Sequence, residues 1–420
     1  MNDLTSANSE LLALAGRVKE ASRLVRLASA QQKNDALGYM AEGLEHASEE
    51  ILAANADDVD RAGRDGMPST QVDRLRLTKA RISDMAAQVL EVAALADPVG
   101  QVTRGYRLTN GLAVSRERVP LGVVAIIYEN RPNVTSDAAA LCLKSGNAAF
   151  LRGSSAAFAS NRAISSVLSE ALAKAGLPRE AVALVPDASR ESAVAFMRLR
   201  GYIDCLIPRG GRSLIAAIEE HATVPYIIDG EGNCHIFVDA SADLDAAENI
   251  VRNAKVQRPS VCNAVETVLV HRAVAPEFLS RIDRLLPEVE IHGDGETCTA
   301  ISRAVPATEE DWATEYLDLK LAIRVVDGVE AAVDHISRYG TGHSEAILTN
   351  DYANANLFVR EVDAAAVLVN ASTRFVDGNQ LGLGAEIGIS TQKLHARGPM
   401  GLEALTTERY VIEGNGQVRG

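Results

Sequence analysis

The feature that most constrains this chain is the stretch at residues 122–128, Gly-Val-Val-Ala-Ile-Ile-Tyr, which carries no charged side chain. A continuous apolar run of this length predicts a β-strand that is covered on both faces. A helix-like segment follows over residues 134–144, and a second apolar strand is expected over 148–151. Strand, helix and strand in this order predict a βαβ unit with two parallel strands.

The same alternation continues to residue 222. Further helices are expected over residues 156–175, 191–200 and 212–222, and further strands over 183–185 and 203–207. A parallel sheet covered by helices is typical of dinucleotide-binding domains. No G-x-G-x-x-G follows the first strand, so the usual phosphate-binding fingerprint of such domains is absent.

Two other glycine-containing loops connect a strand to a helix in this region. They are Arg152-Gly153-Ser154-Ser155 and Pro208-Arg209-Gly210-Gly211-Arg212-Ser213. Glycine lets the backbone approach an anion, and a helix N-terminus offers amides to it. One such loop is a common connector, whereas two in one sheet, each with arginine, favour cofactor binding. The candidate cofactor-binding residues are Arg152, Ser154, Ser155, Arg209, Gly210 and Gly211.

A second α/β unit is expected from about residue 231 onward. Strands are expected over residues 226–228 and 235–238 around this boundary, and then over 264–271, 319–326 and 366–370. Helices are expected over 242–255 and 276–286. The glycine-rich stretch 382–390 is predicted to shape a substrate entrance. The fold class is therefore α/β, with two parallel-sheet domains.

Before residue 96 the apolar side chains recur at steps of three and four, which predicts three packing helices. Their apolar faces are Leu11, Leu14, Val18, Ala21 and Val25; Leu37, Met40, Leu44, Ala47 and Ile51; and Ile82, Met85, Val89 and Val92. Thr78 is expected to cap the third helix.

Residues 102–118 change to a strand-like pattern around Asn110-Gly111, which suits a type I′ hairpin turn. A two-stranded arm is hardly stable alone, so it should pair with another segment of this chain or with another subunit. The C-terminal stretch 408–412 is the expected strand partner.

Cys262 lies in a turn between the expected helix 242–255 and the expected strand 264–271. A thiolate is a strong nucleophile, and Arg258 with nearby backbone amides would favour its attack on an activated carbonyl. The alternative is that Cys262 is one of the buried thiols common in protein cores.

Composition narrows the classes of function. The net charge of −14 opposes nucleic acid and anionic membranes as partners. The five cysteines are odd in number and form no C-x-x-C pair, which favours reduced thiols and no zinc site. His335 and His343 would be the alternative metal ligands, but glycines between them break any shared helical face. The start of the chain lacks a signal-peptide pattern, and the longest apolar run spans about half a membrane. We therefore expect a soluble, cytoplasmic protein.

Five segments together resemble the aldehyde dehydrogenase superfamily, most closely its members that reduce an acyl phosphate. These segments are Tyr128–Asn133, Asp229–Asn233, the turn around Cys262, His335–Ile347 and Gly382–Ser390. The resemblance covers essentially the whole chain. It implies NADPH-dependent reduction of L-glutamyl 5-phosphate to L-glutamate 5-semialdehyde and phosphate, through a cysteine thioester, as a step of proline biosynthesis.

The resemblance also implies roles for single residues. Cys262 corresponds to the catalytic thiol of the superfamily, and Asn130 to its oxyanion-stabilising asparagine. Arg131 and Arg258 are the expected contacts of the substrate anion. Asp229 and Glu231 lie where hydrolytic members carry a water-activating glutamate. Neither receives a base role, because phosphate rather than water exchanges with the acyl group in this reaction.

The cofactor loop departs from the usual pattern of the superfamily. Arg152 takes the place of a cofactor-binding lysine, and Ser155 that of an acidic ribose ligand. A carboxylate would repel a ribose 2′-phosphate that serine and arginine accept, so NADP(H) is favoured over NAD.

The resemblance divides the chain into four parts. They are an NADP-binding domain (1–101 and 119–231), an oligomerisation arm (102–118 and 399–420), a catalytic domain (232–370) and a segment at the mouth of the active site (371–398). The expected partners are a small-molecule substrate and further copies of this chain, and a contact with glutamate 5-kinase is left open. The alternatives are an oxidising or CoA-acylating aldehyde dehydrogenase, and a cofactor-binding scaffold without chemistry.

Overall fold

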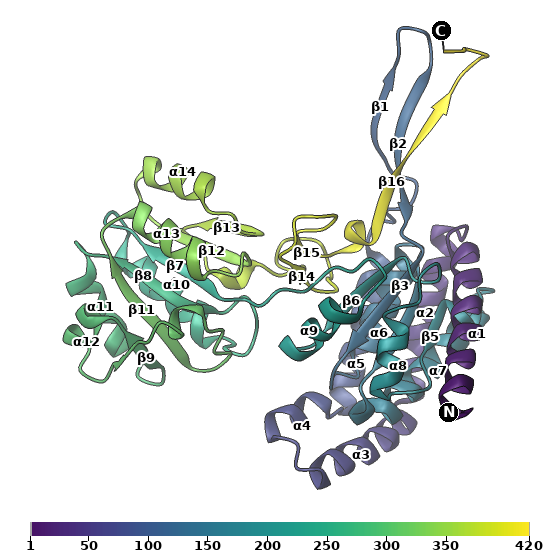
Figure 1. The fold of residues 1–420 in the computed structure, drawn as a ribbon, viewed down its shortest axis with the longest axis horizontal. Coiled ribbons are helices and arrows are strands. Elements are labelled where there is room, and N and C mark those ends of the chain that lie inside the picture. Colours follow the sequence, from purple (N-terminus) through teal and green to yellow (C-terminus); the bar gives the residue numbers. More distant parts are fainter. Residues whose placement is uncertain (1, 420) are drawn as a thin grey trace. The chain divides into compact units, whose positions relative to one another are not determined.

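The computed structural model describes residues 2–419, which divide into two compact units (Figure 1). Unit 1 comprises the chain up to Ile228, Leu383–Gly388 and the residues from Met400 on. Unit 2 comprises Asp229–Gly382 and Ile389–Pro399. The segment expected to form the mouth of the active site, 371–398, is thus divided between the two units.

Unit 1 contains a parallel sheet with the strand order β5-β4-β3-β6. The strands are β3 (Val123–Tyr128), β4 (Ala148–Gly153), β5 (Val182–Leu184) and β6 (Cys205–Arg209). The helices between and after them are α6 (Val134–Lys144), α7 (Phe158–Lys174), α8 (Arg190–Phe196) and α9 (Arg212–His221). Every residue of β3 is buried, as the continuous apolar run predicts. The predicted parallel sheet is confirmed.

Five helices precede this sheet in the chain. They are α1 (Asn2–Val25), α2 (Ala30–His46), α3 (Ser48–Arg64), α4 (Ser69–Leu75) and α5 (Lys79–Ala94). The prediction of three helices is wrong, because the second predicted helix is broken at Ala47, whose φ of −88° and ψ of 11° interrupt the helical geometry. Thr78 caps α5 as expected, since its side chain accepts a hydrogen bond from Arg81 N.

A three-stranded antiparallel arm, with strand order β1-β2-β16, extends from unit 1 (Figure 1). Its strands are β1 (Val102–Arg107), β2 (Ala113–Pro120) and β16 (Thr406–Glu413). The C-terminal strand is the partner of the hairpin, as expected, with Tyr410 opposite Arg116. Within this chain the hairpin thus pairs with its own C-terminal strand, and pairing of the arm with another subunit stays a prediction. Asn147 joins their bases by accepting from Gly122 N and donating to Leu405 O.

The hairpin loop differs from the predicted type I′ turn. Leu108 and Leu112 close a three-residue loop through a 2.8 Å hydrogen bond, and Gly111 N donates to Leu108 O. Gly111 has φ +90°, whereas Asn110 is not among the residues with positive φ. A type I′ turn needs positive φ at both central residues, so this loop is the three-residue form with glycine in the left-handed region.

Unit 2 contains a seven-stranded parallel sheet with the order β10-β9-β11-β8-β7-β12-β13. Its strands are β7 (Cys234–Val238), β8 (Val265–His271), β9 (Glu290–Gly293), β10 (Val305–Pro306), β11 (Lys320–Val326), β12 (Ser344–Leu348) and β13 (Ala366–Val369). Its helices are α10 (Leu244–Val256), α11 (Ala275–Leu285), α12 (Gly295–Ala300), α13 (Val329–Tyr339) and α14 (Tyr352–Glu361). Side chains of α10 and α11 pack on one face of the sheet, and those of α13 and α14 pack on the other. A second parallel-sheet layer therefore exists, as predicted.

The predicted strand 226–228 is wrong. Tyr226 makes an isolated bridge with Leu206, and Ile227 N donates to Leu206 O, so this segment touches β6 without extending its sheet. Near the end of the chain, β14 (Ile389–Ser390) and β15 (Gly398–Pro399) form a short antiparallel pair.

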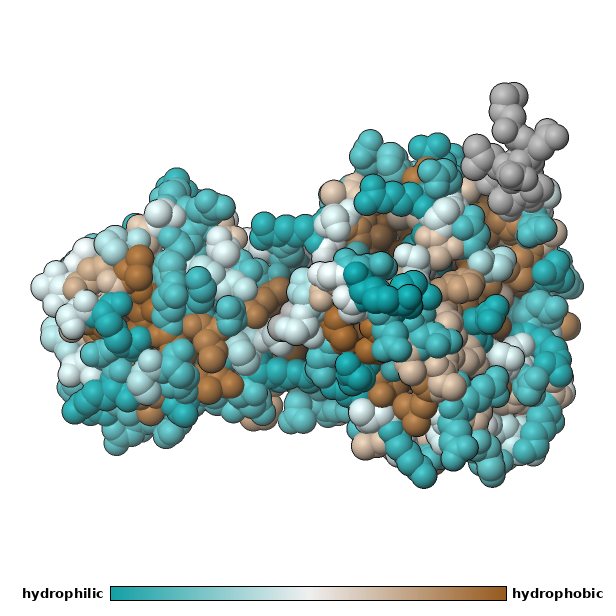
Figure 2. All heavy atoms as spheres, turned by 90° about the horizontal axis from the view of Figure 1, so that it is seen from below, coloured by the Kyte–Doolittle hydropathy of each residue, from teal (hydrophilic) through white to brown (hydrophobic). Residues whose placement is uncertain are grey.

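The face in Figure 2 shows many hydrophilic side chains on each unit, and apolar areas are interspersed among those side chains. Across residues 2–419, no helix combines the length and the apolar character that crossing a bilayer requires.

Candidate active site

The loops after β3, β4 and β6 gather at the carboxyl edge of the unit 1 sheet. The chain crosses from β3 to β4 on one side and returns to β6 on the other. Ligands of open α/β sheets bind where the strand order reverses in this way. Ser154 and Gly210 directly follow β4 and β6, and Asn130 lies two residues after the end of β3.

Asn130 is held in an uncommon backbone conformation by Ser154. The φ angle of Asn130 is +24°, in a region that non-glycine residues rarely occupy. Ser154 Oγ donates to Asn130 Oδ1 over 3.0 Å and accepts from Asn130 N over 3.4 Å. Asn130 Nδ2 donates to Gln71 Oε1 over 3.4 Å. Strained backbone of this kind clusters at functional sites, which supports a role for the Asn130 amide.

Arg152 is buried at the end of β4, with an exposed fraction of 8%. Its Nη2 donates to the carbonyl oxygens of Ala188 and Ser189 over 2.9 and 2.8 Å. Burial lowers the pKa of its guanidinium, and Asp187 opposes that shift. Arg152 therefore holds the loop before α8, and its contact with a cofactor stays a prediction.

The N-terminus of α7 donates hydrogen bonds to a carboxylate of the protein itself. Asp58 of α3 is fully buried, and its Oδ2 accepts from the Ser160 amide and hydroxyl over 2.8 and 2.7 Å. Asp58 also pairs with Arg61, which donates to the Ser155 carbonyl. The backbone amides at this helix end are thus engaged, and an anion at the loop would meet the exposed side chain of Ser155 instead.

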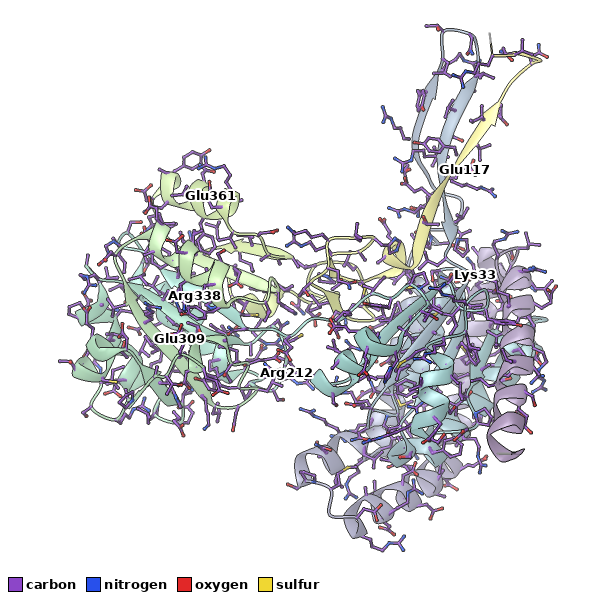
Figure 3. The ribbon with its side chains drawn as sticks, viewed as in Figure 1. Lys33, Glu117, Arg212, Glu309, Arg338 and Glu361 are labelled. Atoms are coloured by element: carbon purple, nitrogen blue, oxygen red, sulfur yellow. The ribbon has the colours of Figure 1, made fainter. Side chains whose placement is uncertain are left out.

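Gly210 and Gly211 form the loop before α9, where Figure 3 labels Arg212. Glu129 follows β3, and its Oε2 accepts from Gly211 N over 3.2 Å. A Cβ on Gly210 would lie 2.8 Å from the Glu129 carboxyl, whereas open space surrounds the equivalent point on Gly211. The Gly211 amide is thus engaged by Glu129, and Gly211 leaves open space beside the backbone for an approaching ligand.

These loops fit a nicotinamide dinucleotide. The segment 153–157 contains no acidic residue, so it would not repel a ribose 2′-phosphate. Ser154, Ser155 and Gly211 would be its contacts, together with Arg209 and Gly210 as predicted from sequence. These assignments remain predictions for each residue.

The turn that carries Cys262 is pinned to the segment after β13 in unit 2. Asn263 is buried, and its Nδ2 donates to Val376 O over 2.9 Å. Thr373 Oγ1 donates to Asn263 O over 2.7 Å. Cys262 itself is half-buried, so its thiol lies in a fixed turn at the surface of unit 2.

Gly232 and Cys234 pack against the backbone of this turn. A Cβ on Gly232 would lie 1.6 Å from the Cys262 carbonyl oxygen, so no other residue type fits there. The thiol of Cys234 donates to the same oxygen over 3.1 Å. Burial raises the pKa of Cys234 well above its usual range, so Cys234 stays a neutral thiol while Cys262 is reachable.

A buried ion pair spans the two ends of the turn. Lys255 Nζ, at the end of α10, lies 2.5 Å from Glu266 Oε2, at the start of β8. Both side chains are completely buried, and Glu266 Oε1 also accepts from Leu317 N. Burial raises the pKa of Glu266 to about 7, and Lys255 opposes the shift. Losing one partner would leave a buried charge uncompensated, so the pair fixes the distance between the ends of the turn.

The two histidines considered as metal ligands have separate surroundings. His335 stacks near Tyr339 and Trp312 and accepts from Arg324 Nη1, while His343 Nδ1 lies 2.8 Å from Ser344 Oγ. Burial lowers the pKa values of His335 and His343 to about 3 and about 4, so both are neutral. Residues 2–419 hold no group of three or more His, Cys, Asp or Glu side chains arranged for a metal ion.

Sequence reasoning missed Arg374, a half-buried cation near Cys262. Its pKa is lowered by burial and then by the charge of Arg258, while a charge on Cys262 raises it. The structure thus brings the predicted Arg258 together with a second guanidinium. The signal was a polar run directly after the last parallel strand, Asn370-Ala371-Ser372-Thr373-Arg374. Arg131 is exposed and belongs to unit 1, so its contact with substrate stays a prediction.

The class of protein follows from the fold and from these two sets of residues. The family model for the aldehyde dehydrogenase family matches residues 9–324. An acetylating aldehyde dehydrogenase from Geobacillus thermoglucosidasius has the same fold, with a TM-score of 0.70 at 16% identity over 99% of each chain. The chain belongs to the aldehyde dehydrogenase family, and within it to the gamma-glutamyl phosphate reductases, as the following relatives show.

The gamma-glutamyl phosphate reductase of Carboxydothermus hydrogenoformans is 55% identical over 98% of this chain and 100% of the relative. That of Moorella thermoacetica is 56% identical over 96% of this chain and 97% of the relative. The crystal structure of the Thermotoga maritima gamma-glutamyl phosphate reductase superposes with a TM-score of 0.96 at 49% identity, over 98% of this chain and 100% of that chain. The predicted family and fold are confirmed.

Proposed function

We propose that the protein reduces L-glutamyl 5-phosphate to L-glutamate 5-semialdehyde, releasing phosphate, in the biosynthesis of proline. The observation that carries the proposal is the half-buried thiol of Cys262 in a turn fixed on several sides. The relatives named gamma-glutamyl phosphate reductase, which match nearly the whole chain, support the choice of substrate.

Cys262 would act as the nucleophile. Its sulfur forms a bond to the acyl carbon as the bond from that carbon to the phosphate oxygen breaks, and phosphate leaves with the electron pair. The negative charge on the carbonyl oxygen needs fixed donors, and Asn130 Nδ2 and the Cys262 backbone amide are the proposed ones. After reduction the thiohemiacetal collapses, and Cys262 leaves as the thiolate.

The family implies a nicotinamide cofactor, and we assign it as NADPH. When bound, NADPH supplies the hydride that reduces the thioester carbon. The exposed Ser155 in an acid-free loop supports the choice of the phosphorylated form. Ser154 would position Asn130 through the two hydrogen bonds described above.

The reaction run backwards tests this function. The purified protein, L-glutamate 5-semialdehyde and NADP should give NADPH, and the rate should rise from near zero with added inorganic phosphate. An oxidising aldehyde dehydrogenase would work without phosphate, and a CoA-acylating one would need CoA. Either result would overturn the assignment, and no NADPH formation with any acceptor would favour a scaffold without chemistry.

The proposal includes an oligomer held partly by the arm. Strand β1 is exposed along its whole length and is an edge of the three-stranded sheet. It presents the apolar side chains of Val102 and Tyr106, which are 60% and 42% exposed. An edge of this kind favours pairing with another copy.

We also propose a cytoplasmic location, because five free cysteines suit a reducing compartment. A contact with glutamate 5-kinase stays an open prediction.

A further inference from the structure

Arg374 lies in a short 3₁₀ helix, Thr373–Phe375, that follows β13 and is fastened to the catalytic turn. The residue before it, Thr373, is fully buried and donates to Asn263 O. Two residues after it, the Val376 carbonyl accepts from Asn263 Nδ2. Asn263, which follows Cys262 in the chain, is thus hydrogen-bonded to one residue before Arg374 and to one residue after it. The backbone of Arg374 therefore has a fixed place beside the nucleophile.

The side chain of Arg374 reaches the residues that precede Cys262 in the chain. Its Nε donates over 3.0 Å to Oε1 of Gln257, the residue that precedes Arg258. This contact leaves both terminal nitrogens of the guanidinium for a ligand. Gln257 is neutral, and among residues 2–419 no carboxylate forms an ion pair with Arg374. Arg281 of α11 differs from Arg374 in this respect. Arg281 forms ion pairs with three carboxylates, which offset its charge.

Two positive charges are thereby brought close together. Gln257, which Arg374 contacts, is the chain neighbour of Arg258. Burial and then the charge of Arg258 lower the pKa of Arg374, while Asp377 and Cys262 act in the opposite direction. Such an arrangement costs free energy without an anion, and a phosphate group is the anion that two guanidinium groups bind best.

We propose that Arg374 and Arg258 together bind the phosphoryl group of the acyl phosphate and hold the phosphate ion that Cys262 displaces. This inference rests on the proposed function and specifies the phosphate subsite for it. The two guanidinium groups stabilise the negative charge that gathers on the phosphate as its bond to the acyl carbon breaks. They would also position the carbonyl carbon beside Cys262, because a single bridging oxygen joins the phosphorus atom to that carbon.

The test uses the full-length protein in the reverse reaction, with inorganic phosphate as the varied substrate. We expect Arg374→Gln to raise the KM for phosphate about 10- to 100-fold, as expected for losing a charge-assisted contact. The KM values for NADP and semialdehyde should change little. Arg360→Gln is the matched control, because Arg360 is an exposed arginine of the same unit that pairs with Glu361. Alkylation of Cys262 by iodoacetamide reports that the turn is intact.

An unchanged KM for phosphate in Arg374→Gln, with Cys262 still reactive, would overturn the inference. If that variant does not fold, Arg258→Gln gives the answer, since Arg258 is exposed and its loss should leave folding intact. Arg258→Gln should raise the KM for phosphate to a similar extent, and no change would overturn the paired site. A wild-type reaction without any phosphate dependence would instead overturn the proposed function itself.

Discussion

The α-carbon of Gly232 packs directly against the backbone carbonyl of Cys262, at a distance that leaves no room for a side chain. The same carbonyl accepts a hydrogen bond from the Cys234 thiol. The backbone of Cys262, the proposed nucleophile, is therefore contacted from β7 and from the loop before it. The position of the thiol is therefore set by contacts that involve no catalytic group.

Gly232→Ala should displace this turn, because the added carbon would overlap the Cys262 carbonyl. We expect the turnover rate to fall by about 100-fold or more, since a small misplacement of a nucleophile is that costly. Steady-state kinetics would measure it, and NADPH binding should persist. Gly295→Ala is the control, because the equivalent space at Gly295 is open. Full activity in Gly232→Ala would show that the turn tolerates displacement.

Cys262→Ala should lower turnover by about 1,000-fold or more, because the thioester can no longer form. NADPH binding, measured by fluorescence titration, and the melting temperature should stay close to those of the wild type, since the thiol is only half-buried. Cys298→Ala is the control, because that thiol lies in α12, away from the turn. An active Cys262→Ala enzyme would disprove the assigned nucleophile.

Ser155→Glu should weaken NADP binding about 10- to 100-fold and leave NAD binding nearly unchanged. The reason is that a carboxylate at this exposed position would face the ribose 2′-phosphate. Isothermal titration with each dinucleotide is the measurement, and Ser155→Ala separates the charge from the loss of the hydroxyl. Equal weakening for both dinucleotides would mean that Ser155 does not contact the ribose.

The buried His343 should make the protein less stable in acid. Its pKa is lowered to about 4 in the folded state, so between pH 6.5 and 4 the unfolded chain binds a proton that the folded chain does not. Its contribution to stability is present above pH 6.5 and is lost as the pH falls, by about 1.4 kcal/mol per pH unit.

His343→Asn removes this titration, so the difference in free energy of unfolding between wild type and variant should shrink from pH 6.5 to 4. Urea unfolding at several pH values measures it. Taking the difference cancels the contributions of other buried groups such as Glu266, whose raised pKa acts in the opposite direction. A difference independent of pH would contradict a neutral buried His343.

Tyr106→Lys should weaken assembly, because it places a charge on the exposed edge of the arm. Deletion of residues 105–115 should lower the mass in light scattering further, since it removes most of the β1–β2 hairpin. Tyr352→Lys is the control, because Tyr352 is 83% exposed on α14 in unit 2. An unchanged mass in both arm variants would exclude the arm as an interface. Figure 3 labels Glu117 on β2, which should stay paired with Arg409 in the point variant.

Much of the fold was predictable because its signals are local. The buried run 123–128 and the helix over 134–144 appear where the apolar pattern placed them, since continuous burial leaves a strong trace in sequence. The break at Ala47 was not predictable, because alanine favours helix and neither glycine nor proline stands at residues 46–48. The hairpin loop type was also missed, since Asn-Gly suits both loops and the pairing of Leu108 with Leu112 chooses between them.

For the site, the sequence by itself determined which loops follow the parallel strands and that Cys262 lies between a helix and a strand. Only the tertiary structure decided which distant residues meet there. Gly232 meets the turn of Cys262 because it precedes β7 as the turn precedes β8, and the amino ends of neighbouring parallel strands lie along one edge of a sheet. Arg374 is brought to the turn by the hydrogen bonds of Thr373 and Val376 with Asn263. A pattern in the sequence records the environment of its own segment, and such long-range neighbours depend on the order of the strands.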